Sequence, residues 1–329
     1  MKPMSNIWPF IKLLPVKTNY KFVKYSAVIG GLSALACAAS LFFTIWPATP
    51  PCGGLNCGVD FRGGTVLELS TVDGKPADLG KIRETLSGQG LGDIQVQAFG
   101  KASDVLVRFE VKPGVNAAQA VDGVKAELAK ALGPLTFPRT EVVGPKISGE
   151  MFRNGVLALV LGIGMMMTYI WFRFGLTFGI GAAAALIHDV LLTFGLFAFT
   201  QMEFTLTAVA SILTIIGYSV NDTVVILDRI RENLRKYKKM PLGDVIDMSI
   251  NETLSRTAIT GVTGIMALTG LAVFGGDALF GFSVSMIFGI VVGTYSSFFI
   301  AAPVLLLLGV KRGEDDEVRP AAAGAAQRP

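Results

Sequence analysis

The chain has 329 residues, of which 51% are hydrophobic and only 16% are charged, whereas soluble globular domains carry about 25% charged residues. This composition argues against a soluble globular enzyme and excludes a disordered or collagen-like chain. The net charge of +4 comes from basic residues that cluster beside long apolar runs. We therefore interpret it as a signal of membrane orientation and not of nucleic-acid binding. The three cysteines fit neither a disulfide framework nor a zinc site, and we expect no metal and no cofactor.

Six apolar runs are each long enough to cross a bilayer, which requires about 20 residues per helix. They cover residues 25–46, 154–172, 176–199, 206–227, 257–274 and 281–308. The sequence therefore predicts an α-helical polytopic membrane protein with six transmembrane helices, five of them within residues 154–310. The first run could be mistaken for a secretory signal, but it exceeds the about 7 to 15 apolar residues of such signals. We expect it to be a retained anchor.

The distribution of lysine and arginine predicts how the chain is oriented, because these residues stay on the cytoplasmic side. Residues 1–24 contain five lysines, residues 228–255 contain a basic cluster, and Lys311 and Arg312 begin the last segment. Both termini are therefore predicted to be cytoplasmic, and residues 47–153 periplasmic. Residues 311–329 are rich in acidic residues, alanine and proline, and we expect a disordered cytoplasmic tail.

The predicted periplasmic segment has the composition of a soluble domain, with twelve basic and twelve acidic residues. Periodicity predicts strands at residues 65–71, 93–99, 104–111 and 139–143, and helices at 77–89 and 116–132. The order β-α-β-β-α-β is that of a ferredoxin-like α+β domain, inserted between the first and second transmembrane helices. This fold indicates nothing about activity.

Cys52 and Cys57 follow the first apolar run in the sequence CGGLNC. In an oxidising periplasm they could form a small-loop disulfide. The alternative is a pair of free thiols in a flexible, glycine-rich linker, and the sequence leaves both open.

Charged residues within the apolar runs are expensive, since a central aspartate costs about 2.5 to 3.5 kcal/mol on insertion scales. Asp222 lies in the fourth run, and Arg256 marks the start of the fifth, so both are predicted on the cytoplasmic side and an ion pair between them is plausible. One interpretation is a proton or cation relay in which the carboxylate alternates between protonated and ionised forms. The other is a static salt bridge that fixes helix packing. We favour the relay.

Polar residues surround Asp222 in the sequence, and we predict that Tyr218, Asn221 and Thr223 form a supporting cluster. Tyr218 and Asp222 are one turn apart and share a helix face. The third run contains His188 and Asp189. Because they are adjacent on a helix, their side chains start about 100° apart. We expect them to be poorly placed to form one site, so that a direct proton role for them is the weaker hypothesis.

Glycines at a four-residue spacing predict close helix packing at Gly175 with Gly179 and at Gly289 with Gly293. After the fourth run, a charged helix is predicted from Asp228 until Pro241 interrupts it. The following residues 242–254 are amphipathic enough to lie at the membrane interface. Whether this loop is only solvated or forms a docking surface stays open.

Five sequence motifs resemble those of one family. They are GVDFRGGT at 58–65, VGPKISGE at 143–150, HDV at 188–190, GYSVNDTVVILDRIRENLR at 217–235 and SRTAITG at 255–261. Together with the topology they resemble SecF, the family of smaller membrane subunits of the bacterial SecDF protein-export complex, which is related to the resistance-nodulation-division transporters. The resemblance implies that Asp222 and Arg256 are the ion-conducting residues. Cys52 and Cys57 are not part of the family pattern.

The resemblance implies a non-enzymatic subunit of the Sec translocase in the bacterial inner membrane. It would couple the proton-motive force, or another ion gradient, to preprotein export. The implied partners are SecD, the SecYEG channel with its associated factors, the unfolded preprotein and the lipid bilayer, but no nucleic acid. One alternative is a half-size exporter of small molecules or lipids from the same superfamily. Another, an intramembrane aspartyl protease using Asp189 and Asp222, is disfavoured because neither aspartate lies in a GxGD motif.

Overall fold

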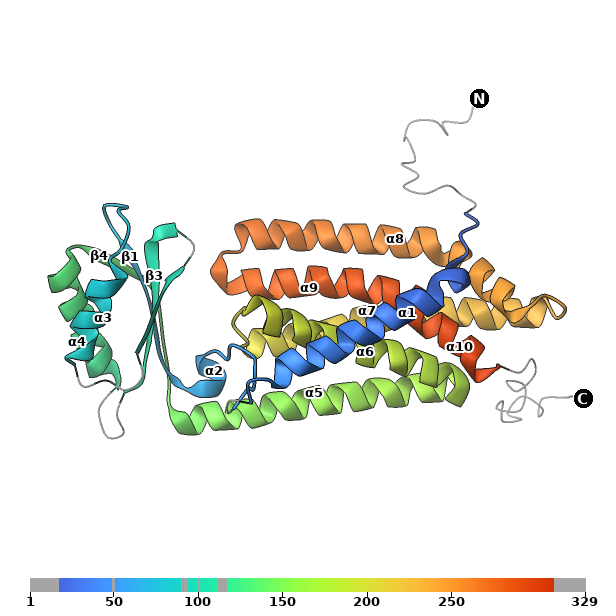
Figure 1. Cartoon of the computed structure of the whole chain (residues 1–329), viewed down its shortest axis with the longest axis horizontal. Helices are drawn as coiled ribbons and strands as arrows, with labels where there is room; N and C mark the ends of the chain where they lie inside the picture. Colours follow the sequence, from blue (N-terminus) through green and yellow to red (C-terminus); the bar gives the residue numbers. More distant parts are fainter. Residues whose placement is uncertain are drawn as a thin grey trace, which may run out of the picture.

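The computed structural model describes residues 18–48, 51–89, 91, 94–99, 101–111 and 117–310. The predicted cytoplasmic segment 1–24 lies outside this part up to residue 17, and the predicted tail 311–329 lies outside it entirely. Figure 1 shows a bundle of long helices with a small domain of strands and short helices at one end. The predicted fold class, a six-helix membrane protein with an α+β domain between the first two transmembrane helices, is confirmed.

Six helical segments in the described part of the chain are long and apolar enough to cross a membrane. They are α1 (Phe22–Ile45), α5 (Pro145–Phe174), α6 (Leu176–Thr200), α7 (Leu206–Lys236), α8 (Leu242–Phe274), and the continuous run of α9 (Asp277–Ser296), a π-helical turn η1 (Ser297–Ala301) and α10 (Ala302–Leu308). Several helices extend well beyond the predicted runs. Hydropathy marks only the lipid-soluble part of a helix, whereas α7 and α8 continue through charged turns.

The six helices divide into an inner and an outer group. In α6, α7 and the α9 to α10 segment, 56% of the residues in the apolar stretch are buried inside the protein. In α1, α5 and α8 the buried share of this stretch is 11% or less. The outer helices therefore expose most of their apolar residues, as expected of surfaces that face lipid. The inner helices supply the buried positions in which polar side chains can pack against protein.

Two glycines bring α9 close to α7. A Cβ atom on Gly293 would lie 2.8 Å from Cβ of Ser219, and one on Gly289 would overlap the side chain of Ile215. The packing role predicted for this pair is confirmed. The same prediction is wrong for Gly175 and Gly179, since Gly175 has a φ of +80° in the turn between α5 and α6 and a Cβ on Gly179 would make only ordinary contacts.

A π-helical turn interrupts the last transmembrane segment at Ser297–Ala301. Pro303 follows at the start of α10. Because proline has no N–H and its ring clashes with the carbonyl four residues earlier, the helix cannot continue with regular α-helical bonds through this point. The wider turn accommodates the proline, and such turns often occur at functional sites.

The external domain has the predicted β-α-β-β-α-β order. Its elements are β1 (Gly64–Thr71), α3 (Leu79–Ser87), β2 (Ile94–Phe99), β3 (Lys101–Phe109), α4 (Ala117–Leu132) and β4 (Leu135–Val143). The sheet order is β2-β3-β1-β4 with every pair antiparallel, which confirms the ferredoxin-like arrangement. Buried residues of β1 and β3, such as Leu67 and Val107, pack with Ile82 of α3 and Leu128 of α4 in one apolar core.

Two parts of this domain differ from the prediction. Strand β4 begins at Leu135, four residues earlier than predicted, and includes Pro138. A proline is tolerated here because β4 is an edge strand with one unpaired side. The short helix α2 (Val59–Arg62) was not predicted, and its Val59 packs with Val66 and Leu106 on the face of the sheet opposite the main core.

The predicted interfacial segment at 242–254 is instead the beginning of α8, which runs unbroken from Leu242 to Phe274. Pro241 precedes it and separates it from α7, as predicted. Val245 and Ile250 are buried with Ile230 of α7 in the core of the helical bundle, so this stretch packs on a neighbouring helix. The predicted loop at 228–255 is therefore mostly a pair of helical extensions.

Candidate functional site

Asp222 lies on α7 with 4% of its surface exposed. Its Oδ2 atom is buried with no hydrogen-bond partner in the described part of the chain. Arg256, on α8, is exposed and interacts electrostatically with Asp222, but no ion pair of 4.0 Å or less joins Asp222 to a described basic residue. The ion pair considered from the sequence is not formed in this state. A buried carboxylate oxygen without a partner is costly, so Asp222 is a group whose charge the fold does not balance by direct contact.

One further polar atom on these two helices lacks a partner among the described residues. It is the hydroxyl group of Thr257 on α8, which is buried without a hydrogen bond, whereas the Tyr218 hydroxyl on α7 interacts with Thr260 of α8. Tyr218 faces α8, since its hydroxyl oxygen would lie 3.9 Å from a Cβ atom on Gly264. By helical spacing, Tyr218 and Asp222 share one face of α7. Between α7 and α8, the Oδ2 atom of Asp222 and the hydroxyl of Thr257 therefore have no hydrogen-bond partner among the described residues.

The structure separates the other two members of the predicted cluster. Thr223 points toward η1, where its Oγ1 lies 2.7 Å from Oγ of Ser297. Asn221 is exposed on the surface of α7. Of the three predicted supporting residues, only Tyr218 lies on the side of α7 that carries Asp222.

A cavity of about 1400 Å³ opens beside Arg256. It lies between the end of α5, the charged part of α7 and the beginning of α8. Its charged lining residues are Arg173, Asp228, Arg229, Arg231, Glu232, Arg235, Lys236, Glu252 and Arg256. Ion pairs order part of this lining, with Asp228 3.1 Å from Arg173 and Glu252 2.6 Å from Arg229. The cavity brings water-accessible space to Arg256 but not to Asp222, which is not part of its wall.

His188 and Asp189 form one site, and the expectation that they would not is wrong. Both are buried, and Nδ1 of His188 lies 2.9 Å from Oδ1 of Asp189. The Oδ2 atom of Asp189 accepts hydrogen bonds from Ser219 of α7 and, at 3.0 Å, from Ser296 of α9. The 100° between adjacent Cβ directions does not prevent two side chains from turning toward each other. The serines that complete the site come from other helices, so no local pattern indicated it.

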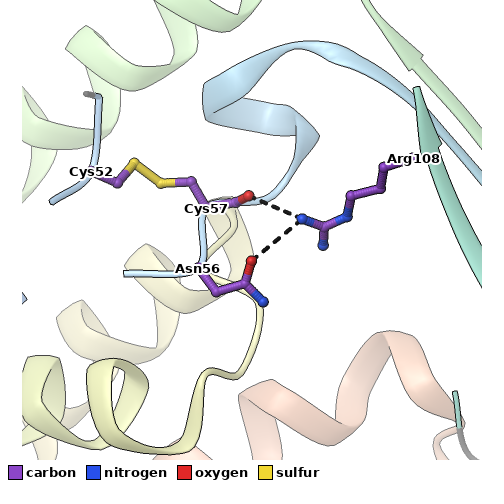
Figure 2. Close-up of a disulfide and its surroundings, with 4 residues drawn as sticks. All are labelled: Cys52, Asn56, Cys57 and Arg108. Atoms are coloured by element: carbon purple, nitrogen blue, oxygen red, sulfur yellow. Dashed lines mark hydrogen bonds between the residues drawn. A yellow bond between two sulfur atoms is a disulfide. The ribbon is translucent and has the colours of Figure 1, made fainter. Parts of the chain in front are cut away.

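The CGGLNC segment lies where the external domain meets the membrane helices. Cys52 and Cys57 form a disulfide, and Arg108 of β3 donates hydrogen bonds to the Cys57 carbonyl at 3.3 Å and to Asn56 Oδ1 at 3.4 Å (Figure 2). Arg108 also forms an ion pair of 2.8 Å with Glu203 in the turn between α6 and α7. The backbone of Phe204 exchanges hydrogen bonds with Asn56 and Gly58 at 2.8 and 3.0 Å. The disulfide loop thus joins the external domain to the helical bundle.

Replacing Cys52 and Cys57 together with serine is expected to lower the free energy of unfolding by about 2 kcal/mol, because a disulfide that closes so short a loop restricts the unfolded chain by about that amount. We also expect faster proteolytic cleavage between residues 51 and 58. Thermal unfolding and limited proteolysis with and without reductant measure both effects. Cys37→Ala, which removes the free cysteine of α1, is the control. Identical unfolding with and without reductant would contradict the prediction.

These observations define a class of protein: a polytopic membrane protein with an external ferredoxin-like domain and buried ionisable groups between its inner helices. In the described part of the chain, no three His, Cys, Asp or Glu side chains gather as a metal site would require.

Comparison with known proteins places the chain within this class. Residues 124–311 match the C-terminal family of the protein export membrane proteins SecD and SecF. Protein translocase subunit SecF of Cereibacter sphaeroides is 46% identical over 311 residues, which cover 92% of this chain and 94% of that protein. SecF of Rickettsia akari is 41% identical over 308 residues, covering 93% and 97%. The chain belongs to the SecF family of Sec protein translocase subunits, and its six apolar helices fit a multi-pass protein of the inner membrane.

Two solved structures have a similar fold. The crystal structure of SecDF, a translocon-associated membrane protein from Thermus thermophilus, matches with a TM-score of 0.79 and 29% identity over 90% of this chain. SecDF in its super-membrane-facing form matches with a TM-score of 0.61 and 31% identity over 92% of this chain. The chain spans only 39% and 40% of those SecDF chains.

Proposed function

We propose that this chain couples an ion gradient, with the proton as the coupling ion, to the export of preproteins across the inner membrane. The observation that carries the proposal is the buried carboxylate of Asp222, whose Oδ2 atom has no hydrogen-bond partner among the described residues, in a member of a translocase family. A static salt bridge, the alternative considered from the sequence, would place Asp222 and Arg256 in direct contact. The separation between them favours a group that exchanges its proton.

Asp222 and Arg256 have different roles in this proposal. Asp222 binds the proton, which removes its charge in the low-dielectric interior. Arg256 lies at the wall of the cytoplasmic cavity, where it can balance the ionised carboxylate and favour proton release toward that side. Moving one elementary charge across the membrane supplies about 2.3 kcal/mol per 100 mV. That energy biases a conformational equilibrium more than about tenfold and is sufficient to drive movement of the external domain.

The proposal includes an orientation and a partner. Positively charged segments favour cytoplasmic termini and a periplasmic external domain. Ion pathways of transporters form between structural repeats. The match to this chain covers only 39% of the SecDF chain, so more than half of SecDF lies outside the match. We infer that SecD supplies the second half of the pathway, against the face of α7 on which Asn221 is exposed. The complex then acts beside the SecYEG channel on an unfolded preprotein.

Export into inverted membrane vesicles tests this function. Vesicles that contain the chain with its partner are expected to show faster preprotein translocation when a proton gradient is imposed, and a protonophore should abolish the difference. Vesicles depleted of the chain are the control. Equal stimulation by the gradient in depleted vesicles would contradict the proposal, and stimulation by a sodium gradient alone would identify sodium as the coupling ion.

Isolation of the complex from membranes in mild detergent separates export of proteins from export of small molecules. We expect mass spectrometry to identify a SecD relative together with components of the channel. Recovery of a periplasmic adaptor or an outer-membrane duct instead would favour the half-size exporter.

A further inference from the structure

The pair formed by His188 and Asp189 lies where four helices meet, and the function proposed above leaves it without a role. Asp189 is 1% exposed and His188 5% exposed. Both carboxylate oxygens of Asp189 are occupied, Oδ1 by His188 at 2.9 Å and Oδ2 by the hydroxyls of Ser219 and Ser296. In contrast to Asp222, this carboxylate is fully hydrogen-bonded. It joins α6 to both α7 and α9.

The second ring nitrogen of His188 extends the network to α1. Its Nε2 atom lies 2.7 Å from the hydroxyl oxygen of Tyr295 on α9, and that oxygen lies 3.1 Å from Oγ of Ser33 on α1. Ser33 is the buried residue of α1, a helix whose other residues are half-buried or exposed. A continuous hydrogen-bonded chain therefore runs from Asp189 through His188 and Tyr295 to Ser33.

The charges around the pair assign a specific role to the imidazole. In the part of the chain that the structure describes, no lysine or arginine forms an ion pair with Asp189. The titratable groups that face the pair are Cys37 of α1 and Tyr295 of α9, and on α7 the nearest is Asp222, three residues beyond Ser219. None of these groups is a cation. Among the described residues that face Asp189, His188 is therefore the one that can carry a positive charge, and an unbalanced buried carboxylate is costly.

The hydrogen bonds of the chain can reverse direction. Protonated Nε2 donates to the Tyr295 oxygen, and the tyrosine hydroxyl then donates to Ser33. When Nε2 is unprotonated, Tyr295 donates to it instead, and Ser33 donates to Tyr295. The step consists only of binding one proton from water at Nε2, with release as its reverse. No other bond is formed or broken, and Nδ1–H continues to donate to Asp189.

We propose that His188 is a second proton-binding group of the ion pathway, with Asp189 as its counter-charge and Tyr295 and Ser33 as partners that reverse their hydrogen bonds when the imidazole gains or loses a proton. The inference rests on the proposed function, because it gives the pathway of Asp222 a second group. Ser219 of α7 connects the two, since it donates to Asp189 one turn before Asp222. A change at His188 thus reaches α1, α7 and the segment before η1.

The chain contains a single histidine, which allows a direct test. The full chain is labelled with ¹⁵N-histidine, purified on a histidine-free tag and placed in lipid nanodiscs. We expect its imidazole ¹⁵N signals to change from those of a cationic ring to those of a neutral ring when the pH is raised. In Asp189→Asn the Nδ1 signal should move, because the carboxylate that accepts its hydrogen bond is gone. In Tyr295→Phe only the Nε2 signal should move. One protonation state at every pH in the wild-type chain would overturn the proposal.

A transport measurement connects this titration to export. In vesicles, His188→Gln is expected to lower gradient-stimulated translocation at least about tenfold, and Ser296→Ala to lower it less. Ser283→Ala is the matched control, since Ser283 is also a buried serine of α9 but bonds only to the backbone of Leu279. Folded His188→Gln with undiminished stimulation would overturn the proposal. Tyr295→Phe replaces His188→Gln if the latter does not fold.

The two proposals fail in different ways. If the wild-type chain gives no gradient stimulation, the proposed function fails, and the ¹⁵N titration still decides whether His188 binds a proton. If Asp222→Asn abolishes stimulation but His188 never changes its protonation state, only the present proposal fails.

Discussion

Replacing Asp222 with asparagine is expected to abolish the gradient-dependent part of preprotein export while leaving a folded, inserted chain. Asparagine has nearly the same shape as aspartate, but its amide neither gains nor loses a proton near neutral pH. The buried Oδ2 atom has no hydrogen-bond partner in the described structure to lose. If one proton per cycle supplies about 2.3 kcal/mol per 100 mV, the stimulation should fall more than about tenfold. Translocation into vesicles with and without an imposed proton gradient measures this loss.

Stability separates the relay from a static salt bridge. Because Asp222→Asn removes a buried charge without direct compensation, the melting temperature should stay unchanged or rise. A structural ion pair predicts the opposite, since breaking it would leave Arg256 without its partner. Arg256→Ala should abolish stimulation as well. Asp228→Asn is the control and should retain stimulation. Asp228 lies on the same helix, but its exposed carboxylate forms an ion pair with Arg173. A large drop in melting temperature together with retained gradient dependence in Asp222→Asn would exclude the relay.

Replacing Gly293 with leucine is expected to have the largest effect on stability. A single Cβ atom at this position would lie 2.8 Å from Cβ and 3.3 Å from the backbone Cα of Ser219. The backbone of α7 would have to move, and overpacking of this kind costs about 2 to 3 kcal/mol. The same movement would pull Ser219 away from Asp189 and disrupt the network of His188. Thermal unfolding in detergent, followed by size-exclusion fluorescence, should show a lower melting temperature and loss of monodisperse protein.

Gly281→Leu on the same helix is the matched control for this prediction. A Cβ atom there would meet no other atom within 4 Å, so the leucine can be accommodated with little change in stability. Both variants gain the same apolar side chain and lose the same backbone flexibility. Equal melting temperatures for the two variants would show that the approach of α9 to α7 does not limit stability.

Secondary structure was predictable wherever one periodic pattern extended over a whole element. The apolar runs located six transmembrane segments, and β-rich or alternating stretches located the strands of the external domain. The errors occurred where contacts with distant parts of the chain determined the local structure. Strand β4 begins before the predicted range and includes Pro138, and the segment after Pro241 is the start of a long apolar helix and not an interfacial segment. Pro303 excludes a regular α-helix at this point, but proline alone does not determine that the irregularity is a π-helical turn.

One part of the candidate site was predictable from the free-energy cost of placing a charged residue in lipid. Asp222 could be selected because an aspartate in an apolar run carries this cost however the helix packs. Its relation to Arg256 could not be predicted, because the separation of two long side chains on different helices depends on how α7 and α8 pack. Asn221 and Thr223 were grouped with Asp222 by proximity along the chain, yet the rotation of α7 directs them elsewhere.

Hydropathy and periodicity along one chain were enough to predict the apolar helices, the order of elements in the external domain and the presence of ionisable residues among apolar ones. Which polar groups meet depends on how the helices pack. Asp189 obtains its partners from α7 and α9, and His188 reaches α1 through Tyr295. The glycines of α9 permit that approach. Hydrogen bonds act over about 3 Å, so they depend on helix positions that no single helix encodes.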